Sequence, residues 1–126
     1  MTRLIITRHG YSAYNKTRMY TGQVDVALTE LGLRQAERTA EYVAETYQID
    51  AIYSSDLKRA MSTAIPLAER IGIPVIREPR IKEIYGGLWE NKLMPEIDEK
   101  YHEDYQIYKT TIGLARYAAA IASSGN

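Results

Sequence analysis

The alternation of short and long apolar segments constrains the fold of this sequence more than any other feature. Short runs rich in β-branched residues at 4–7, 49–53 and 74–77 have the length of buried strands, and the segments before the second and third runs carry apolar residues at helical spacing. The order β, long loop, α, β, α, β predicts an α/β fold with a three-layer α/β/α arrangement and a mainly parallel sheet. Polar residues that follow successive parallel strands are then expected at one edge of the sheet.

The expected helices have recognisable ends. Thr29 is placed to cap the first helix, and the cluster Ser54-Ser55-Asp56 is placed to cap the second. The second helix is expected to stop at Gly72. Pro95 predicts the first turn of a further helix, which carries apolar residues at helical spacing at Ile97, Tyr101, Tyr105 and Tyr108.

Composition narrows the class of function. A chain of 126 residues has room for one domain, and sixteen basic residues balance sixteen acidic ones, which argues against a nucleic-acid binder or a protein that binds anionic membranes. Cysteine is absent, which excludes disulfides, thiolate zinc sites and cysteine nucleophiles. Only three consecutive apolar residues precede Arg8, too few for a signal peptide or a membrane span, so we expect a cytoplasmic protein.

The tripeptide Arg8-His9-Gly10 follows the first expected strand and suits an anion. Glycine permits close approach of a ligand, and the Arg8 guanidinium disfavours a charged imidazolium on His9. A neutral imidazole beside fixed positive charge is a candidate nucleophile toward phosphorus. The alternative is a structural histidine that donates to a backbone carbonyl, and taken alone the tripeptide favours that reading.

Further candidates follow the later strands. Arg59 lies near the start of the second helix, where its guanidinium and the helix N-terminus would address the same anion, although a solvated arginine fits the spacing equally well. Glu83 is a candidate proton donor to a leaving alkoxide, with a surface carboxylate as the alternative. Several loop residues are candidate hydrogen-bond donors to phosphate, or ordinary turn residues: Ser12, Asn15, Thr21, Gly22 and Gln23.

Other site classes are not supported. His102 has charged neighbours and is expected to be solvated, so the two histidines of the chain do not predict a metal site. The sequence lacks the glycine-rich phosphate loops of nucleotide-binding proteins. We expect neither a metal nor a cofactor.

Together these motifs give the chain a resemblance to the histidine phosphatase superfamily, the phosphoglycerate mutase-like proteins, from Leu4 to about Trp89. Ordered motifs over most of the chain are more specific than any one of them. The carriers are Leu4-Ile5-Ile6-Thr7-Arg8-His9-Gly10, Ser12, Asn15, Thr21-Gly22-Gln23, Asp25, Leu28, Thr29, Gly32, Gln35-Ala36, Ser54-Ser55-Asp56-Leu57-Lys58-Arg59-Ala60, Thr63-Ala64 and Glu83-Ile84-Tyr85-Gly86-Gly87-Leu88-Trp89-Glu90.

The resemblance implies a role for each candidate. His9 would become phosphohistidine, Arg8 and Arg59 would neutralise the phosphoryl oxygens, Asn15 would help to bind them, and Glu83 would act as general acid and then base. Water would release the phosphate without a metal. Gln23 and Trp89-Glu90 look more like the small phosphatases of the family than its mutases. The expected function is therefore a phosphomonoesterase acting on a small phosphorylated metabolite, with mutase-type phosphoryl transfer or non-catalytic phosphate binding as alternatives.

The sequence also departs from the family pattern. The family has a second histidine, usually followed by glycine, after a later strand, and that strand lies between the first two strands of the sheet. Beyond His9 this sequence has only His102, whose neighbours in sequence do not match that motif. Tyr11 stands where the family usually has an acid, and Asn91 where a glycine is common. Three interpretations are open: a family domain truncated after its first two-thirds, a homodimer that completes the sheet, or a binding relative. We favour truncation, with a single incomplete domain over 1–126, a matched core at 1–90, a helical insert at 91–110 and an atypical tail at 111–126, and expect weak or no activity.

Overall fold

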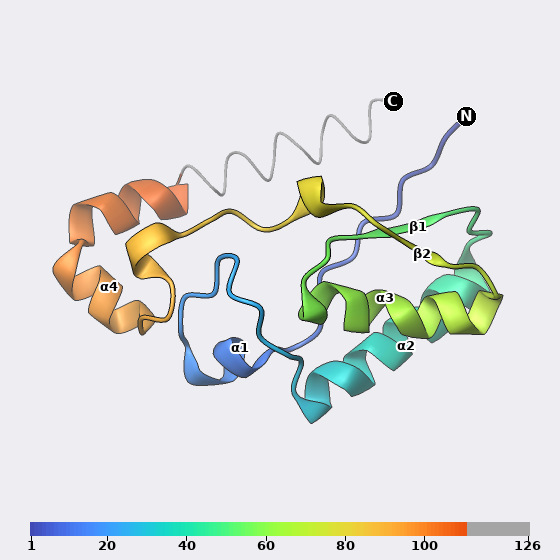
Figure 1. The fold of residues 1–126 in the computed structure, drawn as a ribbon, viewed down its shortest axis with the longest axis horizontal. Helices are drawn as coiled ribbons and strands as arrows, with labels where there is room; N and C mark the ends of the chain where they lie inside the picture. Colours follow the sequence, from blue (N-terminus) through green and yellow to red (C-terminus); the bar gives the residue numbers. More distant parts are fainter. Residues whose placement is uncertain (111–126) are drawn as a thin grey trace. The chain divides into compact units, whose positions relative to one another are not determined.

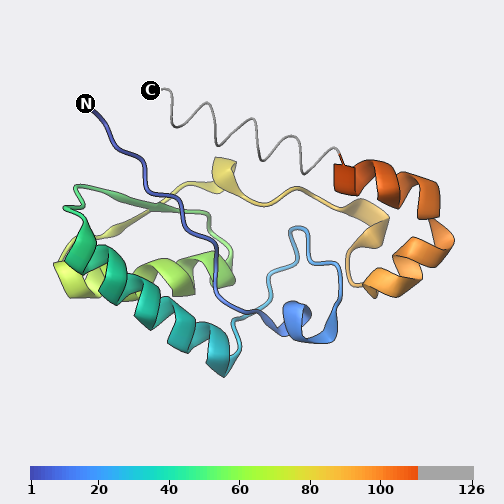
Figure 2. The same ribbon diagram turned by 180° about the vertical axis from the view of Figure 1, so that it is seen from behind.

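The computed structural model describes residues 1–110, shown as a ribbon in Figure 1 and from behind in Figure 2. The described chain separates into two units, one formed by Arg8–Lys92 and the other by Met1–Thr7 with residues 93–110. All candidate site residues lie in Arg8–Lys92. The tail expected at 111–126 lies outside the described residues.

Two helices form the body of the Arg8–Lys92 unit. Helix α2 (Glu30–Thr46) begins after Thr29, whose hydroxyl oxygen accepts a hydrogen bond from the Gly32 amide at 3.1 Å, so the predicted cap is confirmed. Helix α3 (Lys58–Ile71) lies beside α2 (Figure 1). Ala36 and Ala40 on α2 are each 1 % exposed. Their small side chains allow the two helix backbones to approach closely.

A short parallel sheet accompanies these helices. Strands β1 (Ile52–Ser54) and β2 (Val75–Arg77) pair in parallel, with Ile52 opposite Val75 and Tyr53 opposite Ile76, and α3 connects them and packs on both. This confirms the predicted α/β class and the last two predicted strands. Tyr53 and Ile76 are 61 % and 42 % exposed, so the face that they share is uncovered by the described residues.

The first predicted strand is the main correction to the fold. Residues 4–7 form no strand, and Leu4 and Ile6 are 63 % and 70 % exposed where burial on both faces was expected. A strand requires a neighbouring edge that pairs with its amides and carbonyls. The sheet of the described residues contains only β1 and β2. Apolar, β-branched composition was therefore insufficient by itself.

The start of α3 also differs from expectation. Its N-cap is Leu57, which provides no side-chain hydrogen bond, so the predicted capping by residues 54–56 is wrong. Instead the Asp25 carboxylate accepts from the Lys58 amide at 2.7 Å, which places a negative charge at the positive end of the helix. The predicted end is confirmed, because Gly72 caps α3 with a φ of +77° in the left-handed region.

The remaining elements are short. The Arg8–Lys92 unit contains α1 (Ala13–Thr17) and two 3₁₀ turns, at Pro79–Ile81 and Gly87–Trp89. In the other unit α4 (Met94–Lys100) carries a proline in its first turn, as predicted. Residues 102–110 are helical too, so the expected continuous helix is interrupted at Tyr101. No helix among the described residues combines the length and apolar character needed to cross a membrane.

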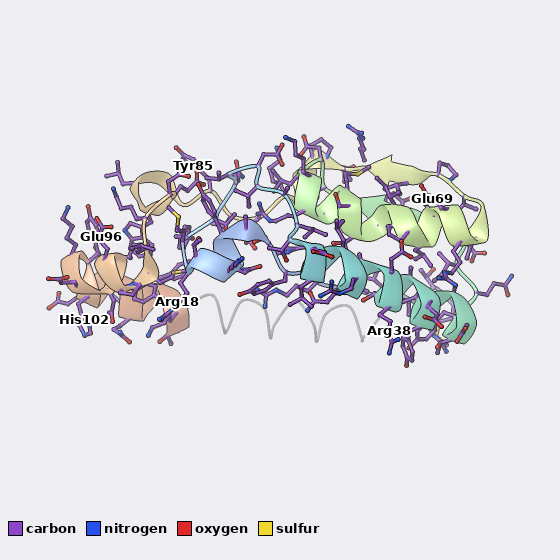
Figure 3. All side chains as sticks on the ribbon, turned by 90° about the horizontal axis from the view of Figure 1, so that it is seen from below. Arg18, Arg38, Glu69, Tyr85, Glu96 and His102 are labelled. Carbon is purple, nitrogen blue, oxygen red and sulfur yellow. The ribbon has the colours of Figure 1, made fainter. Side chains whose placement is uncertain are left out.

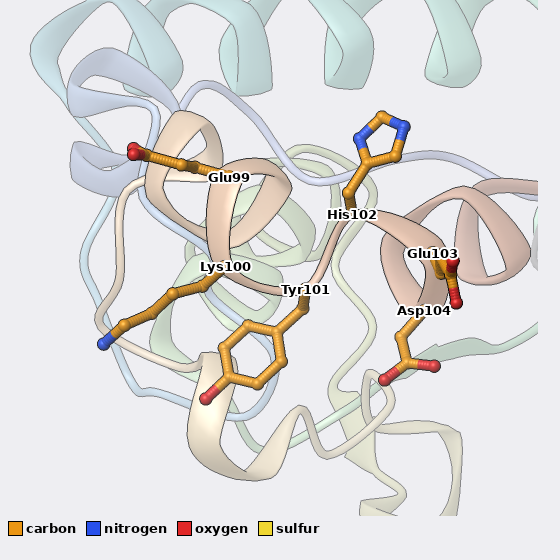
Figure 4. Close-up of a pocket in the computed structure, with 6 residues that line it drawn as sticks. All are labelled: Glu99, Lys100, Tyr101, His102, Glu103 and Asp104. Carbon is orange, nitrogen blue, oxygen red and sulfur yellow. The ribbon is translucent and has the colours of Figure 1, made fainter.

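A surface hollow marks that interruption. Figure 4 shows its lining, which comes from a single stretch of chain and contains none of the candidate site residues: Glu99, Lys100, Tyr101, His102, Glu103 and Asp104. The His102 ring lies 2.8 Å from the Asp98 carboxylate, measured from Nδ1 to Oδ1. That nitrogen is thus paired with a carboxylate one helical turn away.

Candidate active site

The segment that carries His9 is attached to α3 through a threonine hydroxyl. The Gly10 amide donates to Thr63 Oγ1 at 3.0 Å, and this hydroxyl in turn donates to the Arg59 carbonyl at 2.7 Å. Thr63 is 9 % exposed. One buried hydroxyl thus connects the backbone beside His9 to the helix turn that carries Arg59.

The same segment is attached to α2 by close backbone approach. The Tyr11 amide donates to Gln35 Oε1 at 2.8 Å, and the Tyr11 carbonyl accepts from the amide and hydroxyl of Thr29 at 2.9 and 3.0 Å. A β-carbon at Gly10 would overlap the Gly32 carbonyl oxygen, and one at Gly32 would overlap the Tyr11 carbonyl oxygen. Glycine is required at both positions because no side chain fits between these backbones.

The hydrogen bond of the His9 ring fixes its tautomer. His9 Nδ1 lies 2.7 Å from the Gly10 carbonyl oxygen. A carbonyl only accepts, so Nδ1 carries the proton and donates it to this bond. In the neutral ring the lone pair is therefore on Nε2. The ring thus donates to a backbone carbonyl, as in the structural alternative considered from the sequence. The same hydrogen bond leaves Nε2 as the nucleophilic nitrogen.

The charge state of His9 follows from its surroundings. Burial lowers the pKa of this half-buried ring below its ordinary value of 6.5, the hydrogen bond to Gly10 opposes that shift, and the guanidinium groups of Arg59 and Arg8 lower the pKa further. The Glu83 carboxylate acts in the opposite direction. The expected neutral imidazole is confirmed in direction, but desolvation contributes more than the adjacent arginine.

Arg59 is a buried cation held by backbone carbonyls. Its Nη1 donates to the Val24 carbonyl and its Nη2 to the Gly22 carbonyl, both at 2.7 Å, and the residue is 2 % exposed. Burial lowers the pKa of the guanidinium, while the carboxylates of Glu83, Asp25 and Glu90 raise it. The guanidinium stays protonated, and its burial away from water strengthens its field at a nearby anion. The solvated alternative for Arg59 is excluded by its burial.

The loop that holds Arg59 also contacts the segment around Glu83. Gln23 Nε2 donates to the Glu83 carbonyl at 2.9 Å, and the Glu83 carboxylate accepts from the Ile84 amide at 2.9 Å. Glu90 Oε1 accepts from the amides of Gln23 and Gly86 at 2.8 and 3.0 Å. In the same loop, Thr21 contributes its carbonyl to a turn with Val24 at 2.9 Å.

Ser12 and Asn15 form a capping box at the start of α1. Ser12 is fully buried and donates from its amide and hydroxyl to Asn15 Oδ1 at 3.0 and 2.9 Å, while its hydroxyl accepts from the Asn15 amide at 3.2 Å. Ser12 is therefore not presented to a ligand. The side-chain oxygen of Asn15 is occupied, and its NH₂ group is the donor that remains for a ligand.

The structure places Arg8, Arg59 and Glu83 within electrostatic reach of His9, and Glu83 within reach of Arg59. It attaches the Thr21–Gln23 loop to Arg59 and Glu83, and it gives Ser12 and Asn15 a separate local network. Sequence reasoning assigned no part to three residues that now connect the site: Thr63, Asp25 and Glu90. All three belong to the motifs that carry the family resemblance, but the resemblance gave none of them a role in the site. Among residues 1–110 no cluster of three or more His, Asp or Glu side chains is arranged to hold a metal ion.

Asn91 shows how one departure from the family pattern is accommodated. Its φ of +66° lies in the left-handed region, which glycine adopts freely and asparagine tolerates better than most residues. Its amide donates to the Tyr20 carbonyl at 3.1 Å. The fold thus retains the conformation that glycine usually supplies.

Comparisons with known proteins agree on one family. The model of the histidine phosphatase superfamily (branch 1) matches residues 4–119. Phosphoserine phosphatase 1 of Hydrogenobacter thermophilus is 42 % identical over 106 residues, which are 84 % of this chain and 50 % of that protein. A 2,3-bisphosphoglycerate-dependent phosphoglycerate mutase of Bifidobacterium longum is 41 % identical over 106 residues, covering 81 % of this chain and 43 % of the relative.

Solved structures show the same likeness in three dimensions. A mycobacterial glucosyl-3-phosphoglycerate phosphatase in complex with VO3 superposes with a TM-score of 0.70 at 40 % identity, over 72 % of this chain and 45 % of that one. The complex of such a mycobacterial phosphatase with inorganic phosphate gives a TM-score of 0.71 at 36 % identity, over 79 % and 45 %. The chain therefore spans about half the length of the curated relatives it matches.

Proposed function

The chain belongs to the histidine phosphatase superfamily, branch 1, and on that premise we propose that it is a phosphomonoesterase that acts on a small phosphorylated metabolite through a phosphohistidine on His9. The observation that carries the proposal is the state of the His9 ring. Its Nδ1 is bound to the Gly10 carbonyl, its pKa is lowered, and its Nε2 lone pair is available beside Arg8 and Arg59. The relatives named phosphatases support the same reaction class.

The proposed first step forms a bond between His9 Nε2 and phosphorus as the bond from phosphorus to the ester oxygen breaks. The ring gains positive charge in this step, and the Gly10 carbonyl that accepts from Nδ1 stabilises that charge. Arg8 and Arg59 neutralise the negative charge of the phosphoryl oxygens, and the Asn15 NH₂ group donates a hydrogen bond to one of these oxygens. Glu83 in its acid form gives its proton to the departing alkoxide.

The proposed second step returns the protein to its starting state. Glu83, now a carboxylate, accepts a proton from a water molecule as the water oxygen attacks phosphorus, and the bond from phosphorus to Nε2 breaks. Inorganic phosphate leaves and His9 is again a neutral ring protonated at Nδ1. Loss of one of the two arginines should cost about 2 to 4 kcal/mol of transition-state stabilisation, as for a preorganised donor.

Mutase-type phosphoryl transfer is a second candidate, because a relative at 41 % identity is named as a phosphoglycerate mutase. It predicts exchange of the phosphoryl group between substrate positions and dependence on a bisphosphorylated activator. Steady release of inorganic phosphate without exchange would exclude it. A non-catalytic relative would be stabilised by phosphate and release none.

The chain offers a matched control for the test, because it has two histidines and His102 is bound to Asp98. The purified protein, His9→Ala and His102→Ala are each given p-nitrophenyl phosphate, and phosphate release and thermal stabilisation by inorganic phosphate are measured on the same samples. We expect slow release from the unaltered protein and from His102→Ala, and none from His9→Ala. Release that persists in His9→Ala contradicts the mechanism, and stabilisation without release supports the binding alternative.

A further inference from the structure

Glu90 connects two segments that are distant in sequence. Its Oε1 accepts from the Gln23 amide at 2.8 Å and from the Gly86 amide at 3.0 Å. A charged acceptor makes stronger hydrogen bonds than a neutral one. The carboxylate therefore holds the loop at 22–24 against the segment that follows Glu83.

Two glycines make room for this arrangement. A β-carbon at Gly22 would overlap the Glu90 carboxylate, and the φ of Gly22 is +51°, a conformation that side chains disfavour. A β-carbon at Gly86 would overlap the Tyr20 ring. The close contact between Glu90 and the loop therefore requires glycine at position 22, and the packing of the Gly86 backbone on Tyr20 requires glycine at position 86.

One peptide group links Glu90 to Arg59. The Gln23 amide that Glu90 binds and the Gly22 carbonyl that Arg59 binds belong to the same peptide unit. That unit is planar, and in its trans form the N–H and C=O bonds point in opposite directions. Glu90 and Arg59 thus hold the peptide from opposite sides, so that a rotation of the peptide away from one partner also breaks the bond to the other.

Charge connects the same two residues. The Glu90 carboxylate raises the pKa of Arg59, which burial lowers. Arg59 has Nη1 and Nη2 on the carbonyls of Val24 and Gly22. The position of the Arg59 guanidinium therefore depends on the conformation of the 22–24 loop, and Glu90 holds that conformation in place.

We propose that Glu90 is a positioning residue for Arg59, acting through the peptide between Gly22 and Gln23. This inference rests on the proposed function, because the consequence of the positioning is a guanidinium held ready for a phosphoryl group. Glu90 itself does not contact the phosphoryl group. Its removal should weaken phosphate binding through Arg59 and should leave the His9 ring in its tautomer.

The test compares Glu90→Ala with Glu90→Gln, which keeps an acceptor oxygen and removes the charge. Glu69→Ala is the matched control, because Glu69 is an exposed carboxylate on α3 (Figure 3). Amide hydrogen exchange at Gln23 and Gly86 and the dissociation constant for inorganic phosphate are measured for each variant. In Glu90→Ala we expect both amides to exchange at least tenfold faster and phosphate affinity to fall roughly tenfold. Glu90→Gln should recover most of both losses, and Glu69→Ala should change neither.

A double-mutant cycle separates positioning from general weakening of the fold. In an Arg59→Lys background the side chain no longer forms the fork to two carbonyls, so Glu90→Ala should change phosphate affinity less than about twofold. An equal loss in both backgrounds overturns the proposal, as do unchanged exchange at Gln23 and Gly86 in Glu90→Ala or a Glu90→Gln variant no better than Glu90→Ala. If the unaltered protein binds no phosphate, the proposed function fails, while amide exchange still decides whether Glu90 holds the loop.

Discussion

Replacement of Thr63 by valine removes the bond that connects the His9 segment to α3. Valine has the shape of threonine and the same branching at the β-carbon, so the packing of α3 is preserved. Only the hydroxyl is lost, and with it the acceptor for the Gly10 amide and the donor to the Arg59 carbonyl. Thr63→Ser is the matched control, since it retains the hydroxyl and loses one methyl group.

The loss of stability in Thr63→Val can be judged from the hydrogen-bond partners that remain. Gly10 is buried, so its amide is left without an acceptor in Thr63→Val, at a cost of about 1 to 3 kcal/mol. The Arg59 carbonyl lies inside α3, where the regular helix pattern supplies a backbone donor. Thr63→Ser should lose about 1 kcal/mol through the methyl group alone. The two variants therefore differ most at the Gly10 amide.

Urea unfolding followed by circular dichroism gives the change in the free energy of unfolding, and hydrogen exchange of the Gly10 amide reports the bond itself. We expect the free energy of unfolding of Thr63→Val to fall by about 1 to 3 kcal/mol and its Gly10 amide to exchange rapidly. In Thr63→Ser that amide should stay protected. Unchanged protection of Gly10 in Thr63→Val would refute the argument that this hydroxyl anchors the His9 segment.

Three further outcomes are expected. An NMR titration should give His9 a pKa below 6.5, because burial disfavours the charged ring. As the pH falls, the unfolded chain therefore binds a proton at this histidine before the folded protein does. The contribution of the neutral His9 ring to stability is complete above pH 6.5 and is lost as the pH falls below that value. Gly32→Ala should lower the free energy of unfolding by about 1 to 3 kcal/mol in urea, because the added methyl group overlaps the Tyr11 carbonyl oxygen. Asp25→Ala should cost about 1 kcal/mol by thermal unfolding through loss of the acceptor for the Lys58 amide, and Asp25→Asn less.

Each of these outcomes has a result that contradicts it. A His9 pKa above 6.5 would mean that the charged ring is favoured in the folded protein. A Gly32→Ala variant as stable as the unaltered protein would show that the two backbones are not in close contact. Equal losses in Asp25→Ala and Asp25→Asn would show that the negative charge, rather than the acceptor, stabilises the start of α3.

Features set by neighbours in sequence were predictable. The cap of α2 at Thr29 and the end of α3 at Gly72 depend on residues within one turn, and both are confirmed. The pairing of β1 with β2 follows from two short apolar runs joined by one helix. The lowered pKa of His9 was anticipated from charge, although burial, which only the fold determines, contributes more.

Features that depend on distant partners were not predictable. The apolar run at 4–7 has strand composition, but composition does not supply a neighbouring edge. The cap that Asp25 gives to α3 joins residues 33 positions apart, and the bond from Gln23 to Glu90 spans 67 positions. Both acids belong to the family motifs, but acidic residues in loops are common and no local pattern indicates which distant amide each one binds.

In the proposed mechanism the neutral Nε2 of His9 accepts a phosphoryl group, and this step can be tested by trapping the adduct. The protein is mixed with p-nitrophenyl phosphate, quenched in alkali and digested, and the peptides that contain His9 and His102 are weighed by mass spectrometry. We expect one acid-labile phosphoryl group on the His9 peptide and none in His9→Ala. A phosphoryl group on another residue, or phosphate release with no adduct on His9, would contradict it.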